Sequence, residues 1–383
     1  MRETIFLLAL ASLTSGISLR VIEPMLPRLA DDFAVSISSA SMAITAYALA
    51  YAVGQFVYGP LGDRFGKLRV VTLSLFGAAL GSLGCAFAPD LTSLTTLRFF
   101  TALFASAPVT LGMAYIGDQV TVASRQSVIA HFVAGTIIGQ ALGPLVGGIF
   151  TDLLGWRHSF LFLAAAFAIV PALMFLRTRS QWAGSGARSS GGNPFTVHLR
   201  LLARPRVRYV VSAAFSNTFF FFGAYSFIGA FLKLKFDLST SLIGIILAGV
   251  GLGSVLYTLF VGPLLQALGQ RGLVAWGGFI CCLCYALTVL TPFWNIALPA
   301  TIVLGFSFYM LQNTLQTKAT EMAPQERGAG VSLYASSWSL GQAAGVATAG
   351  LAVGSIGFEP TIIAFGLAYL ALGLWLRRNL QKL

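Results

Sequence analysis

The sequence predicts an all-α membrane protein whose twelve transmembrane helices form two similar six-helix bundles. Three observations predict this fold class: a composition that is 57% hydrophobic and only 9% charged, apolar runs that recur along all 383 residues, and a pattern that repeats once. Soluble domains carry roughly 25% charged residues, so this low charge content places the chain in a lipid bilayer.

The apolar runs are long enough to cross a bilayer, which takes roughly 17 to 25 residues of helix. Lipid offers the backbone no hydrogen-bond partner, so each run is expected to be a helix. We expect twelve spans, near residues 5–26, 38–60, 70–88, 92–115, 126–150, 158–177, 208–231, 239–263, 272–291, 296–318, 328–352 and 358–376.

The net charge of +12 follows a membrane topology rather than a nucleic-acid surface. A nucleic-acid partner would need Lys and Arg clustered on one solvated, aromatic-bearing face. Here most of them lie in alternate connections, for example at 62–69 and 200–208, as the cytoplasmic loops of membrane proteins do. We therefore expect an integral inner (plasma) membrane protein with both termini in the cytoplasm, in contact with lipid and not with nucleic acid.

Residues 178–207 divide the chain into two halves. The segment contains QWAGSGARSSGGNPF and several arginines, and its Gly- and Ser-rich composition is typical of a flexible tether. The expected organisation is a first bundle at 1–177, a cytoplasmic linker at 178–207 and a second bundle at 208–383.

The two halves share a pattern at an offset of 202 or 203 residues. Two similar six-helix halves are typical of transporters that rock one half against the other around a central site. The matches are Gly59-Pro60-Leu61 with Gly262-Pro263-Leu264, Gly66 with Gly269, Gly139-Gln140-Ala141 with Gly341-Gln342-Ala343, Gly143 with Gly345, and Arg125 with Arg327.

Two motifs resemble those of a known transporter family. Residues 59–69, GPLGDRFGKLR, resemble the signature loop between helices 2 and 3 of the major facilitator superfamily, with Leu68 at its usual second basic position. Helix 5 resembles the GxxxGxxxGPxxGG pattern typical of the proton-coupled drug antiporters in that superfamily. The resemblance implies the major facilitator fold and the twelve-helix drug:proton antiporter branch. The matching residues are Gly59, Leu61, Asp63, Arg64, Gly66 and Lys67 in the loop and Gly135, Gly139, Gly143, Pro144, Gly147 and Gly148 in helix 5.

Asp63 is expected to join the two halves. The second half has Gln266 at the equivalent position, so the acid is not needed to make the turn. By resemblance, Asp63 points at the N-terminus of helix 11 near residues 328–332, whose unpaired N–H groups carry about half a positive charge.

The bases of the same loop complete this expected latch. By resemblance, Arg64 and Lys67 pair with Asp118 at the cytoplasmic end of helix 4, and the latch as a whole favours an outward-facing state. A simpler interpretation is a positively charged loop with a glycine turn. That interpretation explains the bases but neither the acid nor the two glycines around it.

The glycines of helix 5 recur every four residues and leave one helix face nearly bare. Such a face lets another backbone approach closely, and Pro144 bends the helix. Ordinary small-residue packing would look the same. The expected partner is helix 8, with Gly244, Gly249, Gly251 and Gly253.

Charged residues at membrane depth are costly and usually functional, and Arg20, Glu23 and Arg98 lie there. Arg20 and Glu23 are three residues apart, so they either satisfy each other or serve a site. By resemblance, Glu23 corresponds to the helix 1 carboxylate that exchanges the proton, although relatives often have an Asp at the position of Arg20. Arg98 resembles a helix 4 arginine linked to proton coupling, with Thr101 and Ala102 where Gln-Gly usually follows.

Helices 7 and 10 are expected to line the rest of a central cavity. Two arginines against one glutamate make that cavity cationic, which suits an anionic or zwitterionic amphiphile. Apolar and hydrogen-bonding groups together are typical of a ligand site. Four consecutive phenylalanines, at 219–222, cannot all face it. The candidates are Asn217, Phe221, Tyr225, Tyr309, Gln312, Asn313 and Trp338.

The expected function is a secondary active transporter, a monomer that exports small organic molecules in exchange for protons by alternating access. The alternative is a transporter of one metabolite, an organic anion or a sugar, working with or without coupling. An enzyme is not expected, because His131, His158 and His198 lie far apart in the sequence. No cofactor or metal site is expected either, since the four cysteines lack ligand spacing and are expected to pack as small apolar groups.

Overall fold

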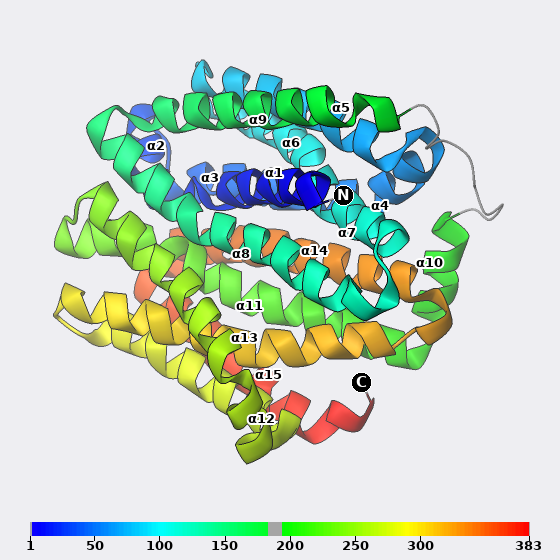
Figure 1. Ribbon diagram of the computed structural model, residues 1–383. Coiled ribbons are helices and arrows are strands. Elements are labelled where there is room, and N and C mark those ends of the chain that lie inside the picture. Colours follow the sequence, from blue (N-terminus) through cyan, green and yellow to red (C-terminus); the bar gives the residue numbers. More distant parts are fainter. Residues whose placement is uncertain (1, 183–193, 383) are drawn as a thin grey trace.

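The computed structural model of the protein describes residues 2–182 and 194–382, and helices are the only regular secondary structure in these ranges. The helices form two groups, with the first half of the chain above the second in Figure 1. Eleven helical segments of the described chain are long and apolar enough to cross a membrane, and one of them contains two spans. The predicted all-α fold with twelve spans is therefore confirmed.

The first half contains six spans. Several are built from two or three consecutive helices, because the chain bends at a polar or proline-containing step within the span. The elements are α1 (Arg2–Arg20), η1 (Glu23–Met25) and α2 (Leu26–Asp32), α3 (Ile37–Ala40) and α4 (Met42–Phe65), α5 (Lys67–Ala86), α6 (Leu91–Ala105) and α7 (Ala107–Gln119), α8 (Val122–Leu153), and α9 (Trp156–Thr178).

The second half contains the other six spans. The eighth and ninth lie in one long helical element, α12, and meet at Gly269, whose φ of 62° and ψ of 172° are not helical. The elements are α11 (Pro205–Phe236), α12 (Thr240–Leu290), α13 (Ala297–Glu321), α14 (Arg327–Ile356) and α15 (Phe358–Asn379).

The backbone turns confirm that the halves are structural repeats. A positive φ angle is rare outside glycine because Cβ collides with the backbone, yet the chain uses it at matched positions. The pairs, offset by 202 or 203 residues, are Ala34 and Asp237 (51° and 50°), Gly66 and Gly269 (90° and 62°), and Gly155 and Gly357 (93° and 88°).

Equivalent helices also pack in equivalent ways. In the first half α8 packs along α1, and in the second half α14 packs along α11. A Cβ atom at Gly139 of α8 would collide with the carbonyl oxygen of Leu13, and one at Gly341 of α14 with that of Phe215. The repeated glycine is therefore needed for the same close helix crossing in each half.

The linker is partly helical. Residues 183–193, which hold most of the Gly- and Ser-rich stretch, lie outside the described residues, but α10 (Pro194–Ala203) follows them. Its Leu201 is fully buried, and the His198 ring lies 5.6 Å from the Phe56 ring of α4. This part of the segment is thus an ordered helix packed on the bundle rather than a free tether.

Both chain ends lie at the same end of the bundle (Figure 1), which we call the tail face. Because successive spans alternate in direction, the turns at Gly66 and Gly269 also lie at the tail face. The turns at Gly155 and Gly357 lie at the other end, which we call the opposite face.

Candidate functional site

The first span is broken where its two charged residues lie. Helix α1 ends at Arg20, and a turn leads to the short helix η1, which begins at Glu23. Pro24 explains the break, because proline has no N–H group and its ring disturbs the helix before it. The second half has Ser226 at the equivalent position, and α11 runs through it without interruption. Broken helices near the bilayer midplane are typical of transporter binding sites.

Arg20 and Glu23 bind each other inside the protein. Arg20 Nη1 lies 2.9 Å from Glu23 Oε1, and the two side chains are 3% and 0% exposed. An isolated charge at this depth would be costly, so each residue depends on the other. Of the two interpretations, the mutual ion pair is present in this conformation, and Glu23 Oε2 has no hydrogen-bond partner among the described residues.

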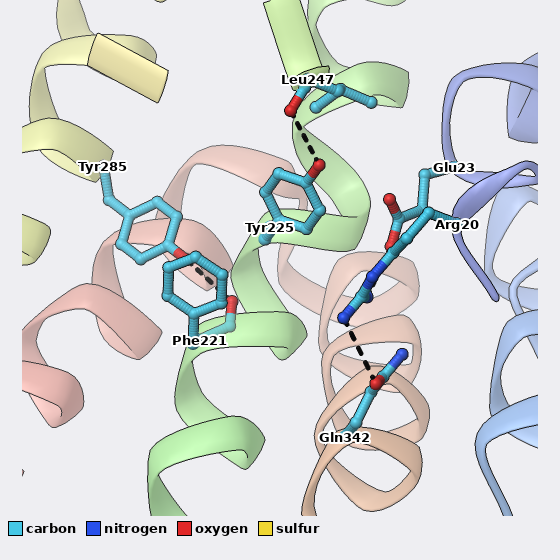
Figure 2. A network of polar contacts seen from close by, with 7 residues as sticks. All are labelled: Arg20, Glu23, Phe221, Tyr225, Leu247, Tyr285 and Gln342. Atoms are coloured by element: carbon cyan, nitrogen blue, oxygen red, sulfur yellow. Dashed lines mark hydrogen bonds and ion pairs between the residues drawn. The ribbon is translucent and has the colours of Figure 1, made fainter. Parts of the chain in front are cut away.

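The same pair reaches across to the second half of the chain (Figure 2). Arg20 Nη2 lies 3.5 Å from Gln342 Oε1 of α14, and the guanidinium lies 3.8 Å from the centre of the Phe222 ring of α11. Tyr225 lies beside Glu23 and donates a 3.0 Å hydrogen bond to the Leu247 carbonyl. We call Arg20, Glu23, Phe222, Tyr225 and Gln342 the central cluster.

Arg98 lies next to this cluster, on the side of the first half. It is fully buried, donates to the Ser18 carbonyl at 2.9 Å, and stacks on Tyr47 with 3.8 Å between the guanidinium and the ring centre. Its Nε and Nη2 have no hydrogen-bond partner among the described residues. Glu23 is within its electrostatic reach. Arg98 thus adds a second buried positive charge, two of whose nitrogens have no partner among the described residues.

Asn217, Phe221 and Gln312, which were predicted to line the cavity, lie in the interior of the second half instead. Asn217 donates to Gln312 at 2.8 Å and accepts from Tyr369 at 2.7 Å, and Phe221 is fully buried with its carbonyl bound to Tyr285 at 2.7 Å. All these partners belong to the second half. The sequence placed the residues on the right helices, but it could not show which way each helix face turns.

Other predicted cavity residues flank the central cluster. The Trp338 ring lies 5.3 Å from the Phe222 ring, edge to face, and Tyr309 is half-buried within electrostatic reach of Arg20. Asn313 is also half-buried and donates to Tyr257 at 3.3 Å within the second half. The sequence analysis chose Phe221 from the run at 219–222, whereas Phe222 is the one that contacts Arg20. It missed the role of Gln342, although the repeat pattern had included that residue.

In the signature loop, Lys67 is the residue that joins two acids. Its Nζ lies 2.6 Å from Asp118 and 3.1 Å from Asp63. Arg64, the other expected partner of Asp118, is exposed and lies against the Phe65 ring. Asp63 is 56% exposed, and the ion pair found for it is with Lys67 rather than with the first turn of α14. The pairing of Lys67 with Asp118 occurs as expected, whereas no contact of Asp63 with residues 328–332 is found among the described residues.

The glycines of the loop have different surroundings. Gly66 ends α4 with a φ of 90°, which only glycine adopts easily. Gly59 lies inside α4, and a Cβ atom there would meet open space. The helix is thus longer than predicted, and the turn comes after Asp63 rather than around it.

The glycine stripe of helix 5 packs against α1 and not mainly against helix 8, which corrects our expectation. Cβ atoms at Gly135, Gly139, Gly143 and Gly147 would meet α1 backbone carbonyls or the turn that follows it. Gly148, one residue further and about 100° around the helix, faces Thr240 and Gly244 of α12. Pro144 also contacts Gly244 through its carbonyl.

Asp152 was not predicted and joins the halves at the opposite face. It ends α8, and its carboxylate accepts hydrogen bonds from the backbone N–H groups of Thr240 at 3.1 Å and Ser241 at 2.6 Å, in the first turn of α12. A carboxylate at a helix N-terminus binds unpaired N–H groups and the positive end of the helix dipole. Asp152 follows Gly148 by one turn and so shares its helix face, which is the signal that could have identified it.

A second helix pair closes the opposite face. Near the end of α14, a Cβ atom at Gly350 would lie 2.8 Å from Ser41 Oγ, just before α4. The two pairs, α8 with α12 and α4 with α14, hold the halves together at this face.

The fold and the site together define a class of protein. Two repeated six-helix halves that meet at buried charges, beside a broken helix, form a transmembrane transporter. The sequence profile of the Major Facilitator Superfamily matches residues 8–327 and 231–382. The chain belongs to this superfamily and is a transporter, not an enzyme.

Known relatives agree with this assignment. The chain is 25% identical over 378 residues to the uncharacterised MFS-type transporter YceJ of Bacillus subtilis (strain 168), covering 94% of this chain and 92% of the relative. It is 24% identical over 277 residues to the efflux pump radE of Floropilus chiversii, covering 65% and 51%.

A solved structure shows the same fold. The chain matches a bacterial homologue of the human lysosomal transporter Spinster, solved in an inward-facing and occupied conformation. The TM-score is 0.77 at 18% identity, over 100% of this chain and 98% of the other.

Proposed function

We propose that the protein is a monomeric, proton-coupled exporter of small amphipathic organic molecules that works by alternating access. The observation that carries the proposal is the buried Arg20–Glu23 pair, which lies at a helix break and reaches Gln342 and Phe222 of the other half. A site that touches both halves changes when the halves move, and its charge state in turn biases that movement. Relatives named as efflux pumps support the direction of transport.

The proton acts through Glu23 in this proposal. The ionised carboxylate of Glu23 binds the cationic group of a zwitterionic amphiphile, and the N–H groups of Arg98 that have no partner among the described residues bind its anionic group. Protonation of Glu23 removes the negative charge that holds the cationic group, and the substrate is released. Proton and substrate then compete for the same carboxylate, which is the requirement for exchange.

The charge of the site favours one substrate class. Arg20 and Arg98 outnumber Glu23, and two N–H groups of Arg98 have no partner among the described residues. An anionic or zwitterionic amphiphile is therefore favoured over a lipophilic cation. The same observation supports the second candidate function, a transporter dedicated to one organic anion.

Alternating access is supported by the contacts between the halves. The opposite face is closed by Asp152 and the glycine contacts of α8 and α14. At the tail face, Asp63 is exposed. By the positive-inside rule the tail face is cytoplasmic, so this conformation is the inward-facing one. Among the described residues, Asp63 pairs with Lys67 and not with α14. An inward-facing form requires this if Asp63 binds α14 only in the outward-facing state.

Transport into inverted membrane vesicles tests the proposal. Vesicles with the protein, and matched vesicles without it, are offered a panel of drugs and metabolites with and without an imposed pH gradient. We expect uptake of a zwitterionic amphiphile that rises with an acidic interior. Uptake unchanged when the gradient is collapsed would refute coupling, and uptake of one metabolite alone would establish the second candidate.

A further inference from the structure

A basic hollow lies at the tail face of the second half, away from the central cluster. It forms where the ninth span begins, just after Gly269 in α12, and where α15 ends. Its volume is about 450 Å³, and Arg271, Trp276, Arg377 and Arg378 line it together with small apolar residues. Three guanidinium groups therefore share one concave surface.

The three arginines have no acidic side-chain partner in residues 2–182 and 194–382. All twelve Asp and Glu residues of the chain lie in the described ranges, and the ion pairs formed there use other bases. Arg204, for example, binds Glu326 at 3.1 Å at the same face. Arg271, Arg377 and Arg378 form no ion pair with any described residue, and no carboxylate lines the hollow. Three like charges held together in this way attract an anion.

The surroundings place the hollow at the depth of lipid headgroups. Trp276 lies on its wall and is 50% exposed, and Trp375, two residues before Arg377, is 39% exposed. Tryptophan gathers at the membrane–water interface, where its ring is partly apolar and partly polar. Further along α12, Phe279 is 47% exposed and continues an apolar surface into the membrane.

We propose that this hollow binds the phosphate headgroup of an anionic phospholipid. The planar fork of arginine donates two parallel hydrogen bonds to a phosphate, and basic pockets between helices at the cytoplasmic side are suited to such headgroups. The exposed tryptophans and Phe279 provide the surface along which the acyl chains lie. A lipid held here bridges the start of the ninth span and the end of the twelfth.

Native mass spectrometry of the full-length protein in detergent tests the proposal, with phosphatidylglycerol and phosphatidylcholine as probes. We expect the wild type to retain phosphatidylglycerol in preference. The triple variant Arg271→Gln, Arg377→Gln, Arg378→Gln is expected to bind it at least about tenfold more weakly, since each surface base contributes to anionic-lipid attraction. The control Arg179→Gln removes an exposed arginine from the tail face of the first half and is expected to bind as the wild type does.

Three results would overturn the assignment. These are equal retention of both lipids, wild-type retention by the triple variant, or an equal loss in Arg179→Gln. Inorganic phosphate and glycerol phosphate serve as further probes, and saturation of the hollow by either without a lipid would identify a soluble-anion site instead. If the triple variant does not fold, as judged by its thermal unfolding, Arg378→Gln alone carries the test and is expected to weaken retention severalfold.

Discussion

Asp152 Oδ2 accepts a 2.6 Å hydrogen bond from the backbone N–H of Ser241, and this bond joins the end of α8 in one half to the start of α12 in the other. We had expected the same interaction elsewhere, with Asp63 at the start of α14 on the tail face. An acid that binds a helix N-terminus across the halves does occur, but here at the opposite face. In the proposed cycle the two acids hold alternate faces closed.

Asp152→Ala is expected to shift the protein towards a state that is open at the opposite face. Removal of a side-chain cap costs about 1 to 2 kcal/mol, and here that loss falls on the closed state alone. Electron spin resonance distances between labels at the facing ends of α8 and α12 measure the shift. The matched control is Asp90→Ala, because Asp90 caps α6 within one half, accepting from Ser93 N–H at 2.8 Å. If Asp90→Ala lengthens the distance between the labels as much as Asp152→Ala does, the prediction is contradicted.

Asp63→Asn is expected to slow transport with little change in thermal stability. The side chain is 56% exposed, and exposed ion pairs contribute at most about 1 kcal/mol to folding. In the proposed cycle, Asp63 stabilises the outward-facing state by binding the first turn of α14. Transport rate and unfolding temperature measure the two effects separately. Asp237→Asn, which neutralises an exposed pair with Lys233 outside the machinery, is the control, and wild-type transport by Asp63→Asn would exclude the latch.

Gly139→Ala is expected to destabilise the first half, because the added Cβ collides with the Leu13 carbonyl of α1. Overpacking of this kind costs about 1 to 3 kcal/mol. At Gly262 a Cβ meets open space, and Ala is the better helix former. The unfolding temperature is therefore expected to be lower than that of the wild type in Gly139→Ala and equal or higher in Gly262→Ala. Equal stability of the two variants would show that the close α1–α8 crossing does not depend on the glycine.

The fold was predictable because its determinants are local in the sequence. Apolar run length sets the spans, and a turn needs a residue that tolerates positive φ, so Gly66 and Gly269 mark equivalent turns. The break in the first span was not predicted. The break depends on Pro24, next to the charged residues Arg20 and Glu23. The apolar run used to predict the span continues through this point, so it gave no sign of the break.

The site was predictable only in part, because residue depth is easier to infer than helix rotation. Arg20, Glu23 and Arg98 are buried charges, and their cost in lipid marks them in any helix orientation. Asn217 and Phe221 face the interior of their own half rather than the central site. A rotation of the helix by a fraction of a turn separates the two orientations, and that rotation is set by packing with helices distant in the sequence. Asp152 was missed for a related reason: its partner is backbone, so only its position one turn after Gly148 points to it.

Proton movement by Glu23→Gln tests the central claim most directly. Gln keeps an oxygen that accepts a hydrogen bond from Arg20 but cannot take up a proton near neutral pH, so the geometry is retained while the exchange is lost. Purified wild type and variant are placed in liposomes with a pH-sensitive dye inside, and a gradient of the compound identified in the vesicle panel is applied. The account predicts that the wild type moves protons against the compound, while the variant exchanges labelled for unlabelled compound without moving protons. Proton movement by the variant at the wild-type rate would contradict it.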